Sequence, residues 1–445
     1  MAYVVERFAN WALTYRAQPL SPEVLHHAKR VVIDWYAALF PGAVVPPATA
    51  LEKACCEELD GDNYKARLAL GRRASVRLAA LINGAAAHTA EVDDIFRDGI
   101  YHPGAPTIAA ALALAQARGI SGEEFLRAVV VGYEISTRIG AAMGRAHYKY
   151  WHNTGTIGCF GACAAAAELL KLDAQRFAHA LATVTTFSAG LQQAFRMDSM
   201  SKPLHAGHAA EAGVTAALAA AEGVTGSLDV IEGEAGYGVA MSNSPDWDKA
   251  LATLGHDFHV TRMTVKNHAC CGHAFAAIDG ALALQAKMKI AANDIEQVRV
   301  ATYKTALDVA FYDEPCTPSE GRFSLKYVVA TALTHGSVRL AAFEPPRLND
   351  PTTRALMRRV DATIDPDLDA TFPGQRAARV TITARDGRSE TYYQPTRIGD
   401  PEAPLTDTQL EDKYLELAAP VIGDAAARTL LARLWRLETI GRMDE

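Results

Sequence analysis

Ser201-Lys202-Pro203-Leu204-His205-Ala206-Gly207-His208 stands directly before an alanine-rich run and predicts the start of a tightly packed helix. Pro203 suits a first helical turn because its φ is fixed and it lacks an N–H. A lysine is disfavoured there, since the helix N-terminus carries positive potential. Lys202 in this place therefore indicates a lysine that binds an anion or transfers a proton. From these residues alone, a solvated lysine beside two packed histidines is an equal alternative.

Similar small-residue segments occur through the first 250 residues and predict an all-helical bundle. Ser21-Pro22-Glu23 begins one such helix, because Ser21 supplies an N-cap oxygen and Pro22 fits the first helical position. Helices rich in Ala and Gly pack closely, which favours a bundle over alternating strands and helices. Further helices are predicted over residues 76–90, 106–117, 122–143, 157–170, 174–191 and 206–222.

After residue 255 the pattern changes to alternating strands mixed with helices. Residues 295–303 and 378–384 alternate, and the turn Asp386-Gly387 leads into a partner strand over 390–393. Helices are predicted between them, over 274–288 and 325–334, and in the tail, over 406–417 and 425–437. The fold class is thus mainly α, with a large discontinuous helical domain and a smaller α/β (α+β) domain. We place the helical domain at 1–255, completed by 396–445, and the smaller domain at 256–395.

Composition and charge limit the classes of partner. The 445 residues are 49% hydrophobic and 21% charged, which is typical of a globular chain with a large core. The net charge of -7 comes without a long basic block and argues against binding to nucleic acid or a membrane surface. The N-terminus lacks the pattern of a signal peptide, and no run reaches the roughly 18 to 20 apolar residues of a membrane span. The seven cysteines show no Cys-x-x-Cys pairs, so we expect reduced thiols in a cytoplasmic protein.

Two polar clusters in the helical region are candidate site segments. Glu91-Val92-Asp93-Asp94, followed by His102, places three carboxylates together, which requires solvation, hydrogen bonds or cations. This cluster either caps a helix or serves a site. The turn from Tyr148 to Thr156 precedes a Gly/Ala/Cys-rich helix, whose amides, with the Thr154 and Thr156 hydroxyls, would bind an anion. A capped helix with aromatic packing is the alternative for the second cluster.

A further cluster, Lys266-Asn267-His268-Ala269-Cys270-Cys271-Gly272-His273, invites a zinc interpretation. Its spacing argues against zinc, because adjacent cysteines do not readily ligate one tetrahedral ion and no second cysteine pair follows. Substrate contact is favoured here over a polar helix entry. No phosphate-binding loop, dinucleotide fingerprint, nucleophile elbow or iron–sulfur cysteine spacing is present.

Taken together, the clusters resemble the MmgE/PrpD family, which includes 2-methylcitrate dehydratase, cis-aconitate decarboxylase and iminodisuccinate epimerase. The resemblance runs along the whole chain. It rests on Ala87 to Asp94 with His102-Pro103, Trp151-His152-x-Thr154-x-Thr156 with Gly158, Lys202-Pro203-Leu204-His205-x-Gly207, Lys266 with Cys271 before a helix ending in Ile278-Asp279, and Phe323-Ser324-Leu325-Lys326-Tyr327.

The resemblance implies a cofactor-free homodimer without a metal, whose site lies between a helical and an α/β domain and takes a small anionic carboxylate. The family's acid/base and carboxylate-binding positions carry over to Asp93, His102, His152 and Lys202. We expect the substrate to be contacted by Thr154, Thr156, Lys266, His273, His205 and Tyr150.

Departures from the family pattern bear on the substrate. Family members commonly have Asp-Phe-Asp-Asp-Thr where this chain has Glu91-Val92-Asp93-Asp94-Ile95. The decarboxylase has a histidine at the position of Cys271, and many relatives have one at the position of Phe275, for which His268 or His273 would have to substitute. These changes disfavour cis-aconitate decarboxylase and leave dehydratase and epimerase open.

The sequence therefore predicts a lyase that removes water from a 2-methylcitrate-like hydroxy acid after abstraction of an α-proton. His102 or His152 suits the proton step, since an imidazole titrates near neutral pH. Lys202 either holds a carboxylate or protonates the leaving hydroxyl. The alternatives are an epimerase or decarboxylase of a related polycarboxylate, and an inactive dimeric binding protein.

Overall fold

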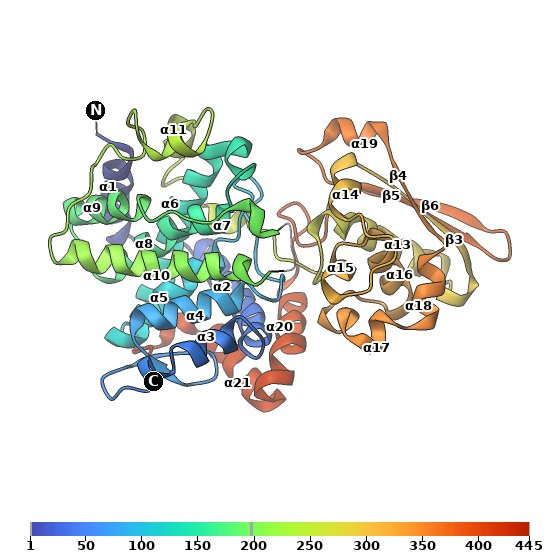
Figure 1. Ribbon diagram of the computed structural model, residues 1–445, viewed down its shortest axis with the longest axis horizontal. Coiled ribbons are helices and arrows are strands. Elements are labelled where there is room, and N and C mark those ends of the chain that lie inside the picture. Colours follow the sequence, from blue (N-terminus) through green and yellow to red (C-terminus); the bar gives the residue numbers. More distant parts are fainter. Residues whose placement is uncertain (1, 196–198, 445) are drawn as a thin grey trace. The chain divides into compact units, whose positions relative to one another are not determined.

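The computed structural model describes residues 2–195 and 199–444, and its contacts divide the chain into two units (Figure 1). Unit 1 comprises Met1–Thr264 and Thr406–Glu445, and unit 2 comprises Val265–Leu405. Helices predominate in the described residues. The chain is thus mainly α, as the sequence predicts.

Unit 1 is a helical body whose central helices pack through small residues. α10 (Ser201–Ala221) lies against α4 (Val76–Ala87) and α8 (Gly158–Leu169). A Cβ on Gly207 would lie 2.3 Å from the carbonyl oxygen of Leu81, so only glycine permits this approach of α10 to α4. Lys202 and Pro203 occupy the first turn of α10, as predicted from the sequence.

The remaining elements of unit 1 complete this body (Figure 1). Its other helices are α1 (Val4–Arg16), α2 (Pro22–Ala43), α3 (Ala48–Ala54), α5 (Gly104–Arg118), α6 (Gly122–Tyr148), α7 (Asn153–Thr156), α9 (Ala174–Thr185), α11 (Tyr237–Met241), α12 (Trp247–Leu251), α20 (Asp407–Ile422) and α21 (Asp424–Leu434). A short hairpin that the sequence analysis did not predict, β1 (Ala66–Arg67) and β2 (Arg73–Ala74), precedes α4. Short 3-10 turns add Cys56–Glu58, Gln192–Phe195, His259–Arg262 and Leu437–Thr439.

The helix α2 begins as the sequence predicts. The Ser21 side chain accepts a hydrogen bond from the Val24 amide, and Pro22 is the first helical residue. No single helix in the described part of the chain is long and apolar enough to cross a membrane. α2 and α3 meet those criteria only as a pair, with a bend of 65° between them.

Unit 2 contains a four-stranded mixed sheet with helices. The strands lie in the order β4-β3-β5-β6, and β3 (Ile295–Thr302) pairs in parallel with β4 (Val360–Ile364) and antiparallel with β5 (Ala378–Ala384). β6 (Ser389–Gln394) pairs with β5 across the predicted turn, so the predictions for β3, β5 and β6 are confirmed, whereas β4 was not predicted.

Helices of unit 2 cover this sheet. α13 (Phe275–Met288) contacts β5 and β6, and α16 (Leu325–His335) contacts α13 and β4. The smaller helices are α14 (Lys304–Val309), α15 (Pro318–Arg322), α17 (Pro345–Leu348), α18 (Pro351–Met357) and α19 (Pro366–Thr371), with 3-10 turns at Gly272–Ala274, Ala292–Asp294 and Leu340–Phe343.

A buried ion pair joins α2 and α20, which belong to the two sequence segments that make up unit 1. Lys413 of α20 donates to Asp34 of α2 at 2.5 Å, and both side chains are fully buried. Lys413 Nζ also donates to the Val92 carbonyl oxygen at 2.7 Å. α20 thus holds the acidic segment that contains Asp93.

Candidate active site

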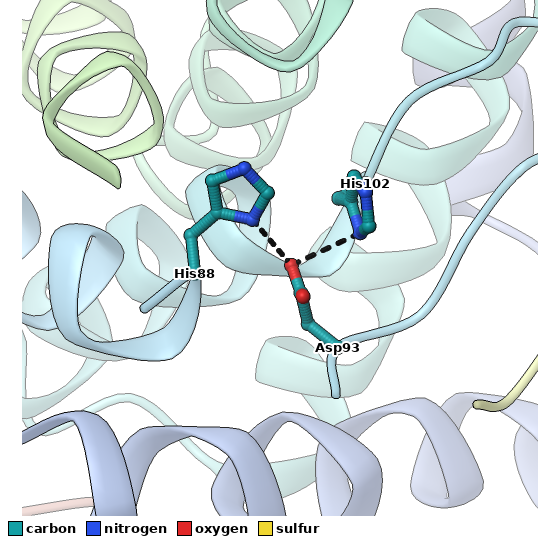
Figure 2. Close-up of side chains that lie close together, drawn as sticks. All are labelled: His88, Asp93 and His102. Carbon is teal, nitrogen blue, oxygen red and sulfur yellow. Dashed lines mark hydrogen bonds and ion pairs between the residues drawn. The ribbon is translucent and has the colours of Figure 1, made fainter. Parts of the chain in front are cut away.

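Two histidines converge on the carboxylate of Asp93 in unit 1 (Figure 2). His88 is the C-cap residue of α4, and Asp93 and His102 lie in the segment that leads to α5. His88 Nδ1 lies 2.7 Å from Asp93 Oδ2, at hydrogen-bond distance. His102 Nδ1 lies 3.2 Å from the same oxygen, an ion-pair distance without the alignment of a hydrogen bond. Asp93 therefore orients two imidazole rings.

The charge of Asp93 fixes the role of His88. Burial opposes ionisation of Asp93, but His102 and His88 outweigh it and hold the pKa of Asp93 well below its usual range. Burial lowers the pKa of His88 against the opposing effect of Asp93, so His88 is neutral at pH 7. Its Nδ1 therefore carries the hydrogen and donates a hydrogen bond to Asp93 Oδ2. Nε2 of His88, which is buried without a hydrogen-bond partner, keeps its lone pair.

His152 and His205 extend the cluster. His152 precedes α7 and its ring stacks on His88, with centroids 5.4 Å apart. His152 Nδ1 and His205 Nδ1, on α10, are 3.0 Å apart, so one of the two donates a hydrogen bond to the other. Burial lowers the pKa of His152 well below its usual value, with His88 and Lys202 adding to the effect, and burial lowers the pKa of His205 to about 4. Both rings are therefore neutral bases at pH 7.

Lys202 brings a cation to the same cluster. Its Nζ contacts the carboxylate of Glu91, and about one-fifth of each side chain is exposed. The positive charge of Lys202 is one cause of the lowered pKa values of His88 and His152, which places the lysine near both rings. The four catalytic candidates Asp93, His102, His152 and Lys202 thus come together in unit 1 with His205.

The other substrate-contact candidates of unit 1, Thr154, Thr156 and Tyr150, differ in burial and in their hydrogen-bond partners. Thr154 Oγ1 accepts a hydrogen bond from the His102 amide at 3.2 Å, and Thr156 Oγ1 lies 2.7 Å from His147 Nε2. Both threonines are fully buried, whereas the Tyr150 side chain is 62% exposed. The two hydroxyls thus support neighbouring histidines, and the roles of all three residues toward a substrate stay predictions.

Lys266 and His273 belong to unit 2. Lys266 is buried, and His273 Nδ1 lies 2.8 Å from the hydroxyl of Tyr303. His268 Nε2 lies 2.8 Å from Asp279 Oδ1, so this histidine has a structural carboxylate partner. Their contact with a substrate, and the substitution of either histidine for the one missing at Phe275, stay predictions.

Two family models match this chain. The model of the MmgE/PrpD N-terminal domain matches residues 6–250, and that of the MmgE/PrpD C-terminal domain matches residues 268–437. The chain belongs to the MmgE/PrpD family. The resemblance inferred from the sequence is confirmed.

Similar MmgE/PrpD proteins align over nearly their full length. The chain is 27% identical to the cis-aconitate decarboxylase-like protein oryM of Aspergillus oryzae, over 99% of this chain and 96% of the relative. It is 25% identical to cis-aconitate decarboxylase of Homo sapiens, over 98% and 92%, and 24% identical to that of Aspergillus terreus, over 96% and 91%. The alignments therefore cover both units.

Within the MmgE/PrpD chain, sequence reasoning missed two members of the cluster. It quoted His88 in a motif but gave it no role, although a histidine five residues before an acidic residue at a helix end is a signal that the two can meet. It treated Glu91 as a departure in composition and not as the partner of Lys202. Loop geometry decides this pairing, since Glu91 and Lys202 are far apart in the sequence.

The same three residues also fit a metal-binding composition. His88, Asp93 and His102 offer ligand atoms that all lie within 4.8 Å of one another. Two histidines and one carboxylate are a common set for a divalent cation. The hydrogen-bond distance of 2.7 Å between His88 Nδ1 and Asp93 Oδ2 favours direct bonding of this pair instead, and a chelation experiment separates the two arrangements.

Proposed function

We propose that the protein is a cofactor-independent lyase that acts on a small di- or tricarboxylic acid. The observation that carries this proposal is the group of neutral imidazoles of His88, His152 and His205, with Asp93 bonded to His88 and the Lys202 ammonium beside them. A neutral imidazole can take or return a proton at carbon, and a cation stabilises the carboxylate or enolate on which negative charge develops.

Dehydration is one reaction for which this arrangement is suited. A histidine removes the proton from the carbon next to a carboxylate, the C–O bond to the hydroxyl breaks, and an acid, Lys202 or a histidine, protonates the departing hydroxyl to give water. Cys271 favours this reaction, with a 2-methylcitrate-like acid as the substrate, because the family resemblance implies a histidine at this position in the decarboxylase.

Decarboxylation is the second candidate, and the names of the full-length relatives favour it. In this reaction the C–C bond to one carboxylate breaks, CO2 leaves, and a protonated group of the cluster gives a proton to the carbon that keeps the electron pair. Incubation of the protein with 2-methylcitrate, cis-aconitate and related acids separates the candidates, because one releases water and the other CO2. Deuterium uptake from heavy water without loss of mass would indicate an epimerase instead.

Lys202→Ala and His152→Ala variants are each expected to lose about 10²- to 10⁴-fold in turnover on the acid that the wild type converts. The reason is that each removes a charged or proton-transferring group from the cluster. His208→Ala and Lys171→Ala are matched controls, because His208 on α10 and Lys171 after α8 are exposed. Unchanged turnover in both site variants would contradict the proposal.

Turnover is expected to survive incubation with a chelator followed by desalting into metal-free buffer. The reason is that Asp93 bonds directly to the imidazole of His88, an arrangement that needs no bridging cation. Activity before and after treatment, with metal content measured by elemental analysis, checks this expectation. A loss that is restored by one divalent cation would show that His88, Asp93 and His102 form a metal site.

A further inference from the structure

The carboxylate of Glu91 contacts the ammonium group of Lys202. The segment that holds Glu91 follows α4 and lies outside any helix or strand. Solvent reaches both partners, since the exposed fraction is 20% for the Lys202 side chain and 21% for Glu91. The ion pair is therefore partly accessible to solutes.

The backbone of Glu91 indicates that this contact is maintained against a local preference. Its φ is 58°, in the left-handed region, which non-glycine residues adopt at a cost and which aspartate and asparagine tolerate better than glutamate. An aspartate would suit this backbone better, but its carboxylate would be one methylene shorter. The glutamate gains reach toward Lys202, and the neighbouring bonds of Val92 and Asp93 hold the segment in place.

Charge explains what Glu91 does there. Lys202 lies in the first turn of α10, where a cation is disfavoured without an anion beside it. The Glu91 carboxylate meets this need, because it is in contact with the Lys202 ammonium. Since Glu91 already contacts Lys202, a substrate carboxylate gains the lysine only when Glu91 gives it up.

We propose that Glu91 occupies Lys202 in the free protein as an internal carboxylate, which the carboxylate of the substrate displaces on binding. This inference rests on the proposed function, because it takes Lys202 as a ligand of a substrate carboxylate. Glu91 is thus a determinant of affinity and of the number of carboxylates that the site accepts. Only the fraction of molecules in which Lys202 is released binds substrate, which weakens the observed affinity by that fraction.

Calorimetric binding of tricarballylate, a tricarboxylic acid without a hydroxyl or a double bond to react, tests the displacement directly. Glu91→Gln is expected to bind this probe about three- to tenfold more tightly than the wild type, since it removes the competing charge. In a Lys202→Met background the same change is expected to have a clearly smaller effect, because the shared partner is gone and only the loss of charge repulsion remains. Glu211→Gln is the matched control, because Glu211 is on α10, the helix of Lys202, and forms an ion pair with Arg77 at 2.8 Å. Its replacement should leave the affinity for tricarballylate unchanged.

The outcomes separate the inference from the proposed function. Equal or weaker binding by Glu91→Gln, with binding by the wild type, would overturn the inference alone and show that Glu91 holds Lys202 in position. Absence of binding in the wild type and in every variant would contradict the proposed function as well. Should Glu91→Gln fail to fold, as judged by near-UV circular dichroism, Glu91→Asp provides the test: its shorter side chain must also tighten binding.

Discussion

An Asp93→Asn variant is expected to keep its fold and to lose about 10²- to 10⁴-fold in turnover. The amide oxygen of an asparagine can still accept the hydrogen bond that His88 Nδ1 donates over 2.7 Å. It lacks the negative charge that stabilises a protonated imidazole, and its NH2 group would face His102 or His88 as a donor. The imidazoles of His88 and His102 are then no longer held in the tautomers that proton transfer needs, and their protonated forms are no longer stabilised by a negative charge.

The neighbouring carboxyl group offers a matched control for this variant. Burial, together with Asp34, raises the pKa of Asp94 to about 8, so Asp94 is protonated at pH 7. It accepts from the Gly104 amide at 3.0 Å and bonds to the Tyr133 hydroxyl at 2.7 Å, and an asparagine can satisfy both groups. Asp94→Asn should therefore retain turnover at pH 7. Equal losses in the two variants, measured as kcat/KM with circular dichroism as the check on folding, would contradict a special role for Asp93.

A Lys413→Met variant is expected to lose about 3–5 kcal/mol of the free energy of unfolding of unit 1. Asp34 and Lys413 are both fully buried, so removal of the lysine leaves a carboxylate without its cation in the core. The Val92 carbonyl oxygen loses a donor at the same time. Replacement of both partners, Asp34→Leu with Lys413→Met, should recover much of the loss, because it leaves no buried charge.

Tryptophan fluorescence during urea unfolding measures this effect in unit 1 alone. All five tryptophans, Trp11, Trp35, Trp151, Trp247 and Trp435, lie within unit 1. Lys171→Met is the control, since Lys171 is 67% exposed in its pair with Glu124 and such surface pairs contribute about 0–1 kcal/mol. A loss in Lys413→Met no larger than in this control would show that the buried pair does not stabilise the unit.

Local signals in the sequence predicted most helices and three of the four strands of the larger sheet. The cap at Ser21 and the first turn around Lys202 are local, because side chains within a few residues determine them. β4 was missed because its five residues, Val360–Ile364, have a single buried residue and depend on the parallel partner β3 for their conformation. The end of the helix predicted at 174–191 was also too late: α9 ends at Thr185.

The site was predicted as a set of residue types, and its internal bonds were not. Asp93, His102, His152 and Lys202 were named from polar clusters and from the family resemblance, and the structure brings them together in unit 1. Their bonding depends on loop conformation and on distant partners. Lys413 lies 379 residues after Asp34, a pairing that no local pattern in the chain indicates.

The bond from Lys413 to the Val92 carbonyl has a consequence for biosynthesis. The segment around Asp93 is translated well before α20, the helix that fixes it. A nascent chain that lacks α20 would carry Asp34 in its core without a counter-ion. Co-translational folding of unit 1 must therefore wait for α20, and the segment around Asp93 acquires its geometry only after that helix has been made.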